Sequence, residues 1–128
     1  MSSCPLIAIV EDDAFVREAT GTLIRSLGFE AVAFPSAEEF LASAAPDEAS
    51  CVITDVQMPG LGGLDLQSNL LARGNRTPII FITAFPEERI RAQAMTNGAV
   101  GFLNKPFKEE LLINCIETAL GAAAAPMA

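Results

Sequence analysis

LIAIVEDD, residues 6–13, is a short and continuous apolar run that ends abruptly in three acids. A run of this length and composition is typical of a strand that is buried on both faces, as in a parallel sheet covered by helices. Further short runs of this kind occur at residues 30–34, 51–54, 78–82 and 100–103. The sequence therefore predicts five short strands, and the runs end next to polar residues.

Segments with helical character separate these runs. We expect helices at about residues 14–27, 37–44, 64–72, 86–96 and 111–120. Asp13 and Ser36 are the expected N-caps of the first two helices, and Gly28 is the expected stop of the first. Residues 46–48 are expected to form a loop. Alternating strands and helices predict an α/β fold with a doubly wound parallel sheet, because parallel strands need crossover connections.

Length and composition indicate one globular domain. The chain has 128 residues, of which 51% are hydrophobic, and this excludes a disordered chain. No apolar stretch approaches the roughly 20 residues that a membrane helix needs, and the first residues lack the pattern of a secretory signal. We therefore expect no membrane association and a cytoplasmic location.

Residue types that are rare or missing exclude several kinds of chemistry. The chain has no histidine, so it lacks a Ser-His or Cys-His nucleophilic pair and a phosphohistidine of its own. Cys4, Cys51 and Cys115 are widely spaced among apolar residues, so we expect buried free thiols and no zinc site. The net charge of −8 argues against direct binding of nucleic acid, whose phosphates require clustered Lys and Arg.

Four of the predicted strand ends carry groups that could share one site. They are the cluster Glu11-Asp12-Asp13, Asp55, Thr83 and Lys105. The carboxyl ends of parallel strands open on one edge of a sheet, where ligands of α/β proteins bind. Carboxylates, a hydroxyl and an amine are thus expected in one crevice.

The acids at this edge suit a magnesium ion. Carboxylates that are brought together repel one another unless they are protonated, pair with a cation or share a metal. Magnesium takes one or two carboxylates plus phosphate oxygens and waters, which fits Glu11, Asp12 and Asp55. A metal-bound aspartate can act as a nucleophile toward a phosphoryl donor, and Lys105 would neutralise charge on the transferred group.

Each of these residues also has an ordinary structural explanation. Lys105 alone would be a surface lysine, and Thr83 alone an ordinary β-branched strand residue. Asp55 could cap the turn that follows it, and Asp13 could cap a helix. These explanations leave the alignment of acids, hydroxyl and amine at one sheet edge unexplained.

Together, the motifs resemble the receiver domain of two-component response regulators. They are Val10-Glu11-Asp12-Asp13, Asp55 with Met58-Pro59-Gly60, Thr83-Ala84 and Lys105-Pro106-Phe107, in this order within residues 6–120. The resemblance implies a flavodoxin-like fold with strand order 2-1-3-4-5 and five flanking helices. It also implies a receiver domain at residues 1–121, with residues 122–128 as a flexible tail or the start of a linker.

The same resemblance assigns roles at the sheet edge. Asp55 is the expected phosphoacceptor, which takes a phosphoryl group from a phosphohistidine of a sensor histidine kinase. Glu11, Asp12 and Asp55 are the expected magnesium ligands, together with the main-chain carbonyl of Gln57. Arg17 is expected to fix the alignment of the acids. Glu11 departs from the family pattern, because aspartate is common there and the extra methylene could shift the metal or place it through water.

Three further residues are assigned to the response. Thr83 resembles the switch hydroxyl that turns toward the phosphoryl group. Lys105 resembles the lysine beside that group, in an expected cis peptide with Pro106. Phe102 occupies the aromatic switch position, where tyrosine is more familiar, so its switching is expected to rest on ring packing rather than on a hydrogen bond.

Residues 34–40, FPSAEEF, and 83–85, TAF, resemble the nitrogen-fixation type of regulator. The resemblance implies a phosphorylation-dependent switch whose surface at residues 86–96, 100–103 and 111–120 changes its affinity for an output partner or effector. The thin apolar face of residues 86–96 fits an element of low local stability. Intrinsic autodephosphorylation is expected, and a homodimer that forms on phosphorylation is a further possibility.

Two other functions use similar chemistry or the same fold. A magnesium-dependent phosphatase of the aspartyl-phosphate kind also uses an Asp, a Thr or Ser, and a Lys. Those enzymes resemble Asp-x-Asp after the first strand, whereas Asp55 is followed by Val56 and Gln57. An adaptor that is never phosphorylated would retain the fold alone. Multiple turnover on phosphomonoesters would favour the phosphatase, and failure to bind magnesium would favour the adaptor.

Overall fold

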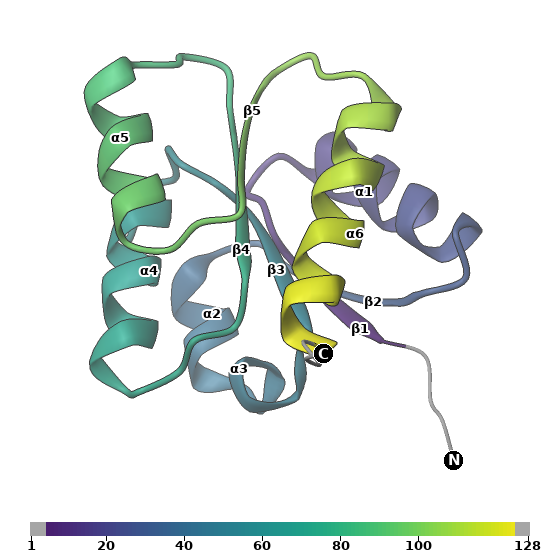
Figure 1. Ribbon diagram of the computed structural model, residues 1–128, viewed down its shortest axis with the longest axis horizontal. Helices are drawn as coiled ribbons and strands as arrows, with labels where there is room; N and C mark the ends of the chain where they lie inside the picture. Colours follow the sequence, from purple (N-terminus) through teal and green to yellow (C-terminus); the bar gives the residue numbers. More distant parts are fainter. Residues whose placement is uncertain (1–4, 125–128) are drawn as a thin grey trace.

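Five parallel strands form one sheet in the computed structural model, which describes residues 5–124 (Figure 1). The strands are β1 (Leu6–Val10), β2 (Glu30–Phe34), β3 (Cys51–Asp55), β4 (Ile79–Thr83) and β5 (Gly101–Asn104). Their order is β2-β1-β3-β4-β5, and every neighbouring pair is parallel. The predicted doubly wound sheet and its strand order are confirmed.

Six helices cover the sheet within the described residues. They are α1 (Ala14–Ser26), α2 (Ala37–Ala42), α3 (Ala45–Glu48), α4 (Gly63–Ala72), α5 (Glu88–Thr96) and α6 (Glu109–Ala124). Figure 1 shows α1 and α6 on one face of the sheet and α2, α3, α4 and α5 on the other. The molecule therefore has three layers, with the sheet in the middle.

The structure has one short helix, α3, in addition to the five helices that the sequence predicts. The four-residue α3 covers all of residues 46–48, where a loop is expected, so that expectation is wrong; Pro46 lies in the first turn of the helix. Proline is favourable there because its missing N–H would have no intrahelical partner, and the acids Asp47 and Glu48 complement the helix dipole.

The remaining differences are at element ends. Helix α5 begins at Glu88 rather than at residue 86, and α2 ends at Ala42 rather than at residue 44. Helix α6 continues to Ala124, beyond the expected domain limit at residue 121. Residues 125–128, the end of the expected tail, lie outside the described part of the chain.

The predicted caps bound the first two helices. The Asp13 carboxylate accepts a hydrogen bond from the amide of Phe15 at 2.9 Å, and the Ser36 hydroxyl accepts one from the amide of Glu39 at 3.1 Å. Gly28 ends α1 with a φ of +94°, a conformation that glycine adopts without strain. The two N-caps therefore fix where α1 begins after β1 and where α2 begins after β2, and Gly28 fixes where α1 ends.

Alternate strand residues fill two cores, one on each face of the sheet. The core beneath α1 and α6 includes Ile7, Ile9, Ile24, Ile53, Ile80, Ile82, Leu112 and Ile116. The core beneath α2, α4 and α5 includes Ala8, Val10, Phe40, Val52, Leu66, Leu70, Phe81 and Ala94. All residues of β3 and β4 are buried, so the polar groups at their ends are held by strands that are packed on both faces.

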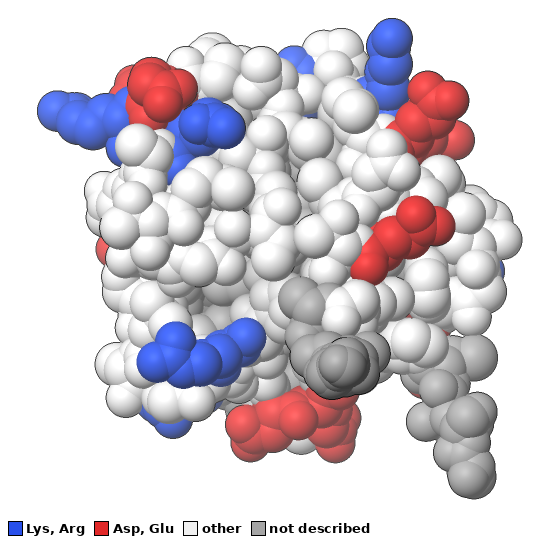
Figure 2. Space-filling model, in the orientation of Figure 1, with Lys and Arg blue, Asp and Glu red and all other residues white. Residues whose placement is uncertain are grey.

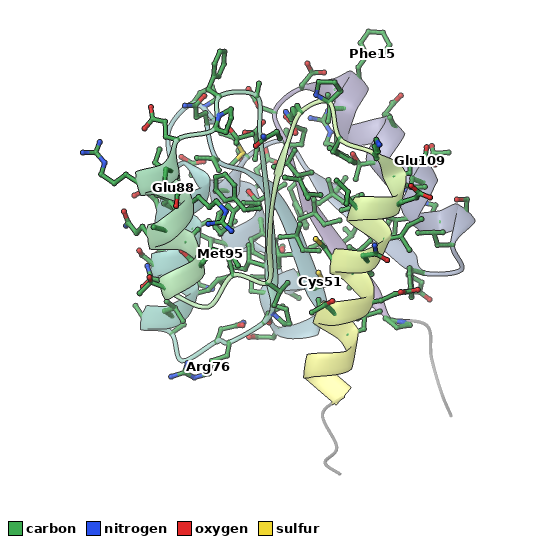
Figure 3. All side chains as sticks on the ribbon, turned by 45° about the horizontal axis from the view of Figure 1, so that its top comes forward. Phe15, Cys51, Arg76, Glu88, Met95 and Glu109 are labelled. Atoms are coloured by element: carbon green, nitrogen blue, oxygen red, sulfur yellow. The ribbon has the colours of Figure 1, made fainter. Side chains whose placement is uncertain are left out.

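Two cysteines belong to the core between the sheet and α6. Cys51 is buried on β3, inside the molecule in Figure 3, and Cys115 on α6 is only partly buried. Both are free thiols, as expected, while Cys4 lies outside the described residues. Among residues 5–124, no helix combines the length and apolar character that crossing a membrane requires.

Candidate functional site

The polar strand ends meet at one edge of the sheet, as predicted. Glu11 follows β1, Asp55 ends β3, Thr83 ends β4 and Lys105 follows β5. This edge is at the top of Figure 1, next to the loops that lead into α1, α5 and α6. Parallel strand order thus brings Glu11 and Lys105 into contact although 94 positions separate them.

Three acids at this edge converge on one point. Carboxylate oxygens of Glu11, Asp12 and Asp55 lie within 4.8 Å of one another. Glu11 and Asp55 are buried, with exposed fractions of 3% and 6%, whereas Asp12 is exposed. Oxygen ligands that face solvent on one side suit magnesium, which retains several waters when bound. The residues present therefore fit the predicted ion.

The Lys105 ammonium pairs with two of these acids. Its Nζ lies 2.6 Å from Oδ2 of Asp55 and 3.1 Å from Oε1 of Glu11. The main-chain N–H of Lys105 donates to the carbonyl of Thr83 at 2.7 Å, which ties the start of the loop to β4. The peptide bond to Pro106 is cis, as predicted. The cation expected at this edge is therefore directed at the carboxylates.

Burial and crowding change the proton affinities of this cluster. Burial and the nearby charge of Asp55 raise the pKa of Glu11 from 4.5 to about 7, against the opposing effect of hydrogen bonds from Lys105 and from the amide of Asp13. Burial by itself lowers the pKa of Lys105, but hydrogen bonds to Asp55 and Glu11 together with the negative charges of these two acids outweigh it, and the pKa is raised. Lys105 is thus charged at neutral pH, and Glu11 holds a proton more tightly than a free carboxyl group does.

Main-chain contacts fix the acids after β1. Arg17 on α1 donates from Nη1 to the carbonyl of Glu11 at 2.8 Å. The amide of Asp13 donates to Oε2 of Glu11 at 3.2 Å. The alignment expected from Arg17 therefore acts on the main chain of Glu11 rather than on its carboxylate.

The loop after β3 wraps closely around Asp55. The amide of Gln57 donates to Oδ1 of Asp55 at 3.0 Å, and the amide of Gly63 donates to the carbonyl of Val56 at 2.9 Å. A Cβ on Gly63 would overlap the carbonyl oxygen of Asp55, so only glycine fits where α4 starts against β3. The main-chain N–H of Gln57 thus faces the Asp55 carboxylate, while the residue itself is exposed.

Thr83 and Phe102 lie at and beside this edge. Thr83 is 1% exposed, and its Oγ1 accepts a hydrogen bond from the amide of Phe85 at 3.0 Å. Phe102 is half-buried on β5, with its ring centroid 6.2 Å from that of Phe81. A cavity of about 240 Å³ lies between Phe102 and the start of α5, at Glu88. Thr83 belongs to the cluster of strand ends, whereas Phe102 borders the cavity next to it.

One contact near this edge has no counterpart in the sequence prediction. Glu38, in the first turn of α2, accepts a hydrogen bond from the amide of Leu61 at 3.1 Å. The sequence contains Glu38 in the FPSAEEF motif, but 23 positions separate it from Leu61. No local spacing indicates that the two residues meet, because their contact depends on how α2 packs beside the loop.

Comparison with known proteins agrees with the site. Residues 7–117 match the model of the response regulator receiver domain. Nodulation protein W of Bradyrhizobium diazoefficiens is 43% identical over 92% of this chain and 52% of its own length. The transcriptional regulatory protein FixJ of Azorhizobium caulinodans is 36% identical over 92% of this chain and 56% of that protein. The chain thus spans about half the length of the curated relatives that it matches.

Solved structures agree with the sequence matches. The response regulator StyR has a TM-score of 0.88 and 40% identity, covering 95% of this chain and 62% of that one. The structure of FixJ-N has a TM-score of 0.83 and 32% identity, covering 99% of both chains. The family model matches most of the chain, and the fold and relatives agree with it. The chain therefore belongs to the response regulator receiver domain family, and its relatives include regulators of the nitrogen-fixation type.

Proposed function

We propose that this domain is a phosphorylation switch in which Asp55 is the phosphoacceptor. A phosphohistidine of a sensor histidine kinase is the donor: an oxygen of the Asp55 carboxylate attacks phosphorus, the P–N bond breaks, and its electron pair returns to the imidazole. The observation that carries the proposal is the placement of Asp55. Its carboxylate lies at the end of β3, with Glu11 and Asp12 on one side and Lys105 within hydrogen-bonding distance.

Four groups of this chain would hold the magnesium ion. They are the carboxylates of Glu11, Asp12 and Asp55 and the main-chain carbonyl of Gln57. When bound, magnesium neutralises charge on the phosphoryl oxygens. Lys105 supplies a second positive charge, and its ammonium can pass from the Asp55 carboxylate to an oxygen of the new phosphoryl group.

Thr83 and Phe102 would convert phosphorylation into a change of shape. Because Oγ1 of Thr83 accepts from the amide of Phe85, its own proton is available to donate to a phosphoryl oxygen. Phe102 lacks a hydroxyl, so its movement is a change of ring packing against Phe81 and into the neighbouring cavity. The Thr83 hydroxyl binds the new phosphoryl group, and the Phe102 ring on β5 changes its packing when Thr83 moves.

The surface of α5, β5 and α6 is the proposed output face. In Figure 2 the area between α5 and α6 is largely uncharged, with charged groups toward its margins. Met95 on α5 and Leu111 on α6 are 36% and 48% exposed. Of the nine residues of α5, Ala94 alone is buried, so little apolar packing holds this helix in place. A helix held so weakly suits a surface that is remodelled when Asp55 is modified.

The proposed partners are a sensor histidine kinase and a downstream effector. FixJ of Azorhizobium caulinodans is a transcriptional regulatory protein about twice as long as the matched region, which supports an effector domain attached beyond a receiver at residues 1–121. With a net charge of −8, the receiver itself is not proposed to bind nucleic acid. A cytoplasmic location, intrinsic autodephosphorylation and dimerisation on phosphorylation belong to the same proposal. A phosphatase is not favoured, because the chain belongs to the receiver family.

Acetyl phosphate and magnesium provide the direct test. Intact-mass measurement should show a gain of one phosphoryl group in the wild type, none in Asp55→Asn, and a normal gain in the matched control Asp47→Asn, whose carboxylate is exposed on α3. Removal of magnesium with EDTA should abolish the gain. A wild-type protein that stays unmodified would falsify the proposal.

A further inference from the structure

Glu38 contacts the loop after Asp55 from a separate helix. Its Oε2 accepts a hydrogen bond from the main-chain N–H of Leu61 at 3.1 Å. A Cβ on Gly60 would lie only 2.5 Å from the same oxygen, so the main chain of the loop and the end of the Glu38 side chain are in close contact. Gly60 has a φ of +77°, a conformation that also favours glycine. Both observations place the Glu38 carboxylate directly against the main chain of the loop.

The same loop carries the groups that surround Asp55. It begins with Gln57, whose amide donates to Oδ1 of Asp55, and it closes where the amide of Gly63 donates to the carbonyl of Val56. Both of these hydrogen bonds lie within the segment that joins β3 to α4. Glu38 belongs to α2, so its bond fixes the loop relative to a different part of the fold.

Glu38 is itself held by an anchored helix. Ala37 and Phe40, which flank it on α2, are completely buried in the core. The Ser36 hydroxyl caps the helix by accepting from the amide of Glu39. The main chain of Glu38 is therefore anchored, and its exposed side chain reaches from this anchored turn to the Leu61 amide.

We propose that Glu38 is a positioning residue for the phosphorylation site. By accepting from the Leu61 amide, it holds the loop in the form in which the main chain of Gln57 faces Asp55. This inference rests on the proposed function of Asp55, and it adds a role for the FPSAEEF motif. Loss of one exposed hydrogen bond to a carboxylate corresponds to about a threefold to tenfold change in an equilibrium constant.

Three variants distinguish a positioning role of Glu38 from an effect of its negative charge and from an effect on folding. Glu38→Ala removes the acceptor, and Glu38→Gln removes the charge but retains an oxygen that can accept from Leu61. Glu39→Ala is the matched control, because Glu39 is an exposed neighbour of the same charge on the same turn. Urea unfolding should show all three variants folded, since none of these changes alters a buried side chain.

The first measurement needs no metal. Hydrogen exchange of the Leu61 amide, followed by NMR, should accelerate about threefold to tenfold in Glu38→Ala and stay near the wild-type rate in Glu38→Gln and Glu39→Ala. Unchanged exchange in Glu38→Ala would overturn the inference, because the hydrogen bond would then not restrain the loop.

The second measurement connects the loop to the site. The dissociation constant for magnesium should rise about threefold to tenfold in Glu38→Ala, with recovery in Glu38→Gln, and phosphorylation by acetyl phosphate at subsaturating magnesium should slow in parallel. Equal affinity in wild type and Glu38→Ala, with both proteins phosphorylated, overturns this inference alone. A Glu38→Gln protein that behaves like Glu38→Ala shows that charge acts instead, and also overturns it. A wild type that is never phosphorylated overturns the function of Asp55 and the role of Glu38 together.

Discussion

The Lys105 ammonium lies 2.6 Å from Oδ2 of Asp55, across 50 positions of sequence. The lysine follows the edge strand β5, the aspartate ends the central strand β3, and β4 lies between the two strands. A cation therefore already lies beside the carboxylate that we propose as the phosphoacceptor. Phosphorylation of Asp55 would require this ion pair to rearrange, since the phosphoryl group adds oxygens that attract the same ammonium.

Replacing Lys105 should destabilise the metal-free protein more than the magnesium-loaded one. Lys105→Met leaves Asp55 and Glu11 buried without their cation, which should lower the free energy of unfolding by about 2–3 kcal/mol in EDTA. Magnesium restores positive charge to the same acids, so the loss should shrink in its presence. Urea unfolding with EDTA and with magnesium measures both values. The exposed Lys108→Met is the control, and an equal loss under both conditions would contradict the expectation.

Glu11 should make the metal-free protein less stable as pH rises. Its pKa is raised from 4.5 to about 7, so the folded state binds the proton more tightly than the unfolded state. The contribution of Glu11 to stability is therefore fully present below about pH 4.5 and is lost as the pH rises through about 7. At pH 8, Glu11→Gln should be more stable than wild type by up to about 3 kcal/mol, and the difference should be much smaller near pH 5.

Urea unfolding in EDTA at both pH values measures this difference. Glu18→Gln, an exposed change on α1, provides the control for the loss of one acidic group. If Glu11→Gln and wild type differ in free energy of unfolding by the same amount at pH 5 and pH 8, that result would count against the raised pKa of Glu11. Magnesium should reverse the preference at pH 8, because the ionised carboxylate of Glu11 is the form that binds the cation.

The hydroxyl of Thr83 should be needed for the response rather than for phosphorylation itself. Thr83→Val retains the shape of the side chain but removes the hydroxyl, whereas Thr83→Ser retains the hydroxyl. Both variants should gain one phosphoryl group from acetyl phosphate. Hydrogen exchange in α5 should change on phosphorylation in wild type and Thr83→Ser, and most of this change should be absent in Thr83→Val. A full response in Thr83→Val would argue that the switch does not use this hydroxyl.

Cys51 should resist alkylation in the folded protein. Burial and the nearby Cys115 thiol raise the pKa of Cys51 to about 12, so very little of this thiol is ionised at pH 8. Cys115 is less buried, although burial also raises its pKa, and it should react faster with iodoacetamide. Peptide mass spectrometry after brief labelling at pH 8 measures both rates. Unfolding in urea should remove the difference, and rapid native labelling of Cys51 would contradict its burial.

The strands could be predicted because burial on both faces leaves a strong local signal. Residues 51–53, for example, are apolar and are followed by Thr54 and Asp55, and the structure places all five residues in the fully buried β3. Helix α3 left no such signal, because its four residues include Pro46 and are too few to show a helical period. Strands and helices that are long enough to repeat their hydrophobic pattern can thus be predicted from the sequence, whereas a single helical turn cannot.

Some contacts of the candidate site could likewise be predicted from the sequence, whereas others could not. The edge at which Asp55, Thr83 and Lys105 lie follows from strand order, and strand order followed from the family resemblance. Sequence left open whether Lys105 faces a carboxylate or a future phosphoryl oxygen, and the structure pairs it with carboxylates. The contact of Glu38 with Leu61 could not be predicted, because the packing of α2 beside the loop decides it.

The bond between Glu11 and Lys105 joins the first strand to the last across 94 positions, and this has a consequence for synthesis on the ribosome. A nascent chain that has emerged only as far as β4 contains the acids but not the cation that pairs with them. The carboxylates of Glu11 and Asp55 would then lie close together without the Lys105 ammonium, which disfavours folding of this edge of the sheet before β5 is present. Arrival of β5 completes the sheet and supplies the lysine at the same time.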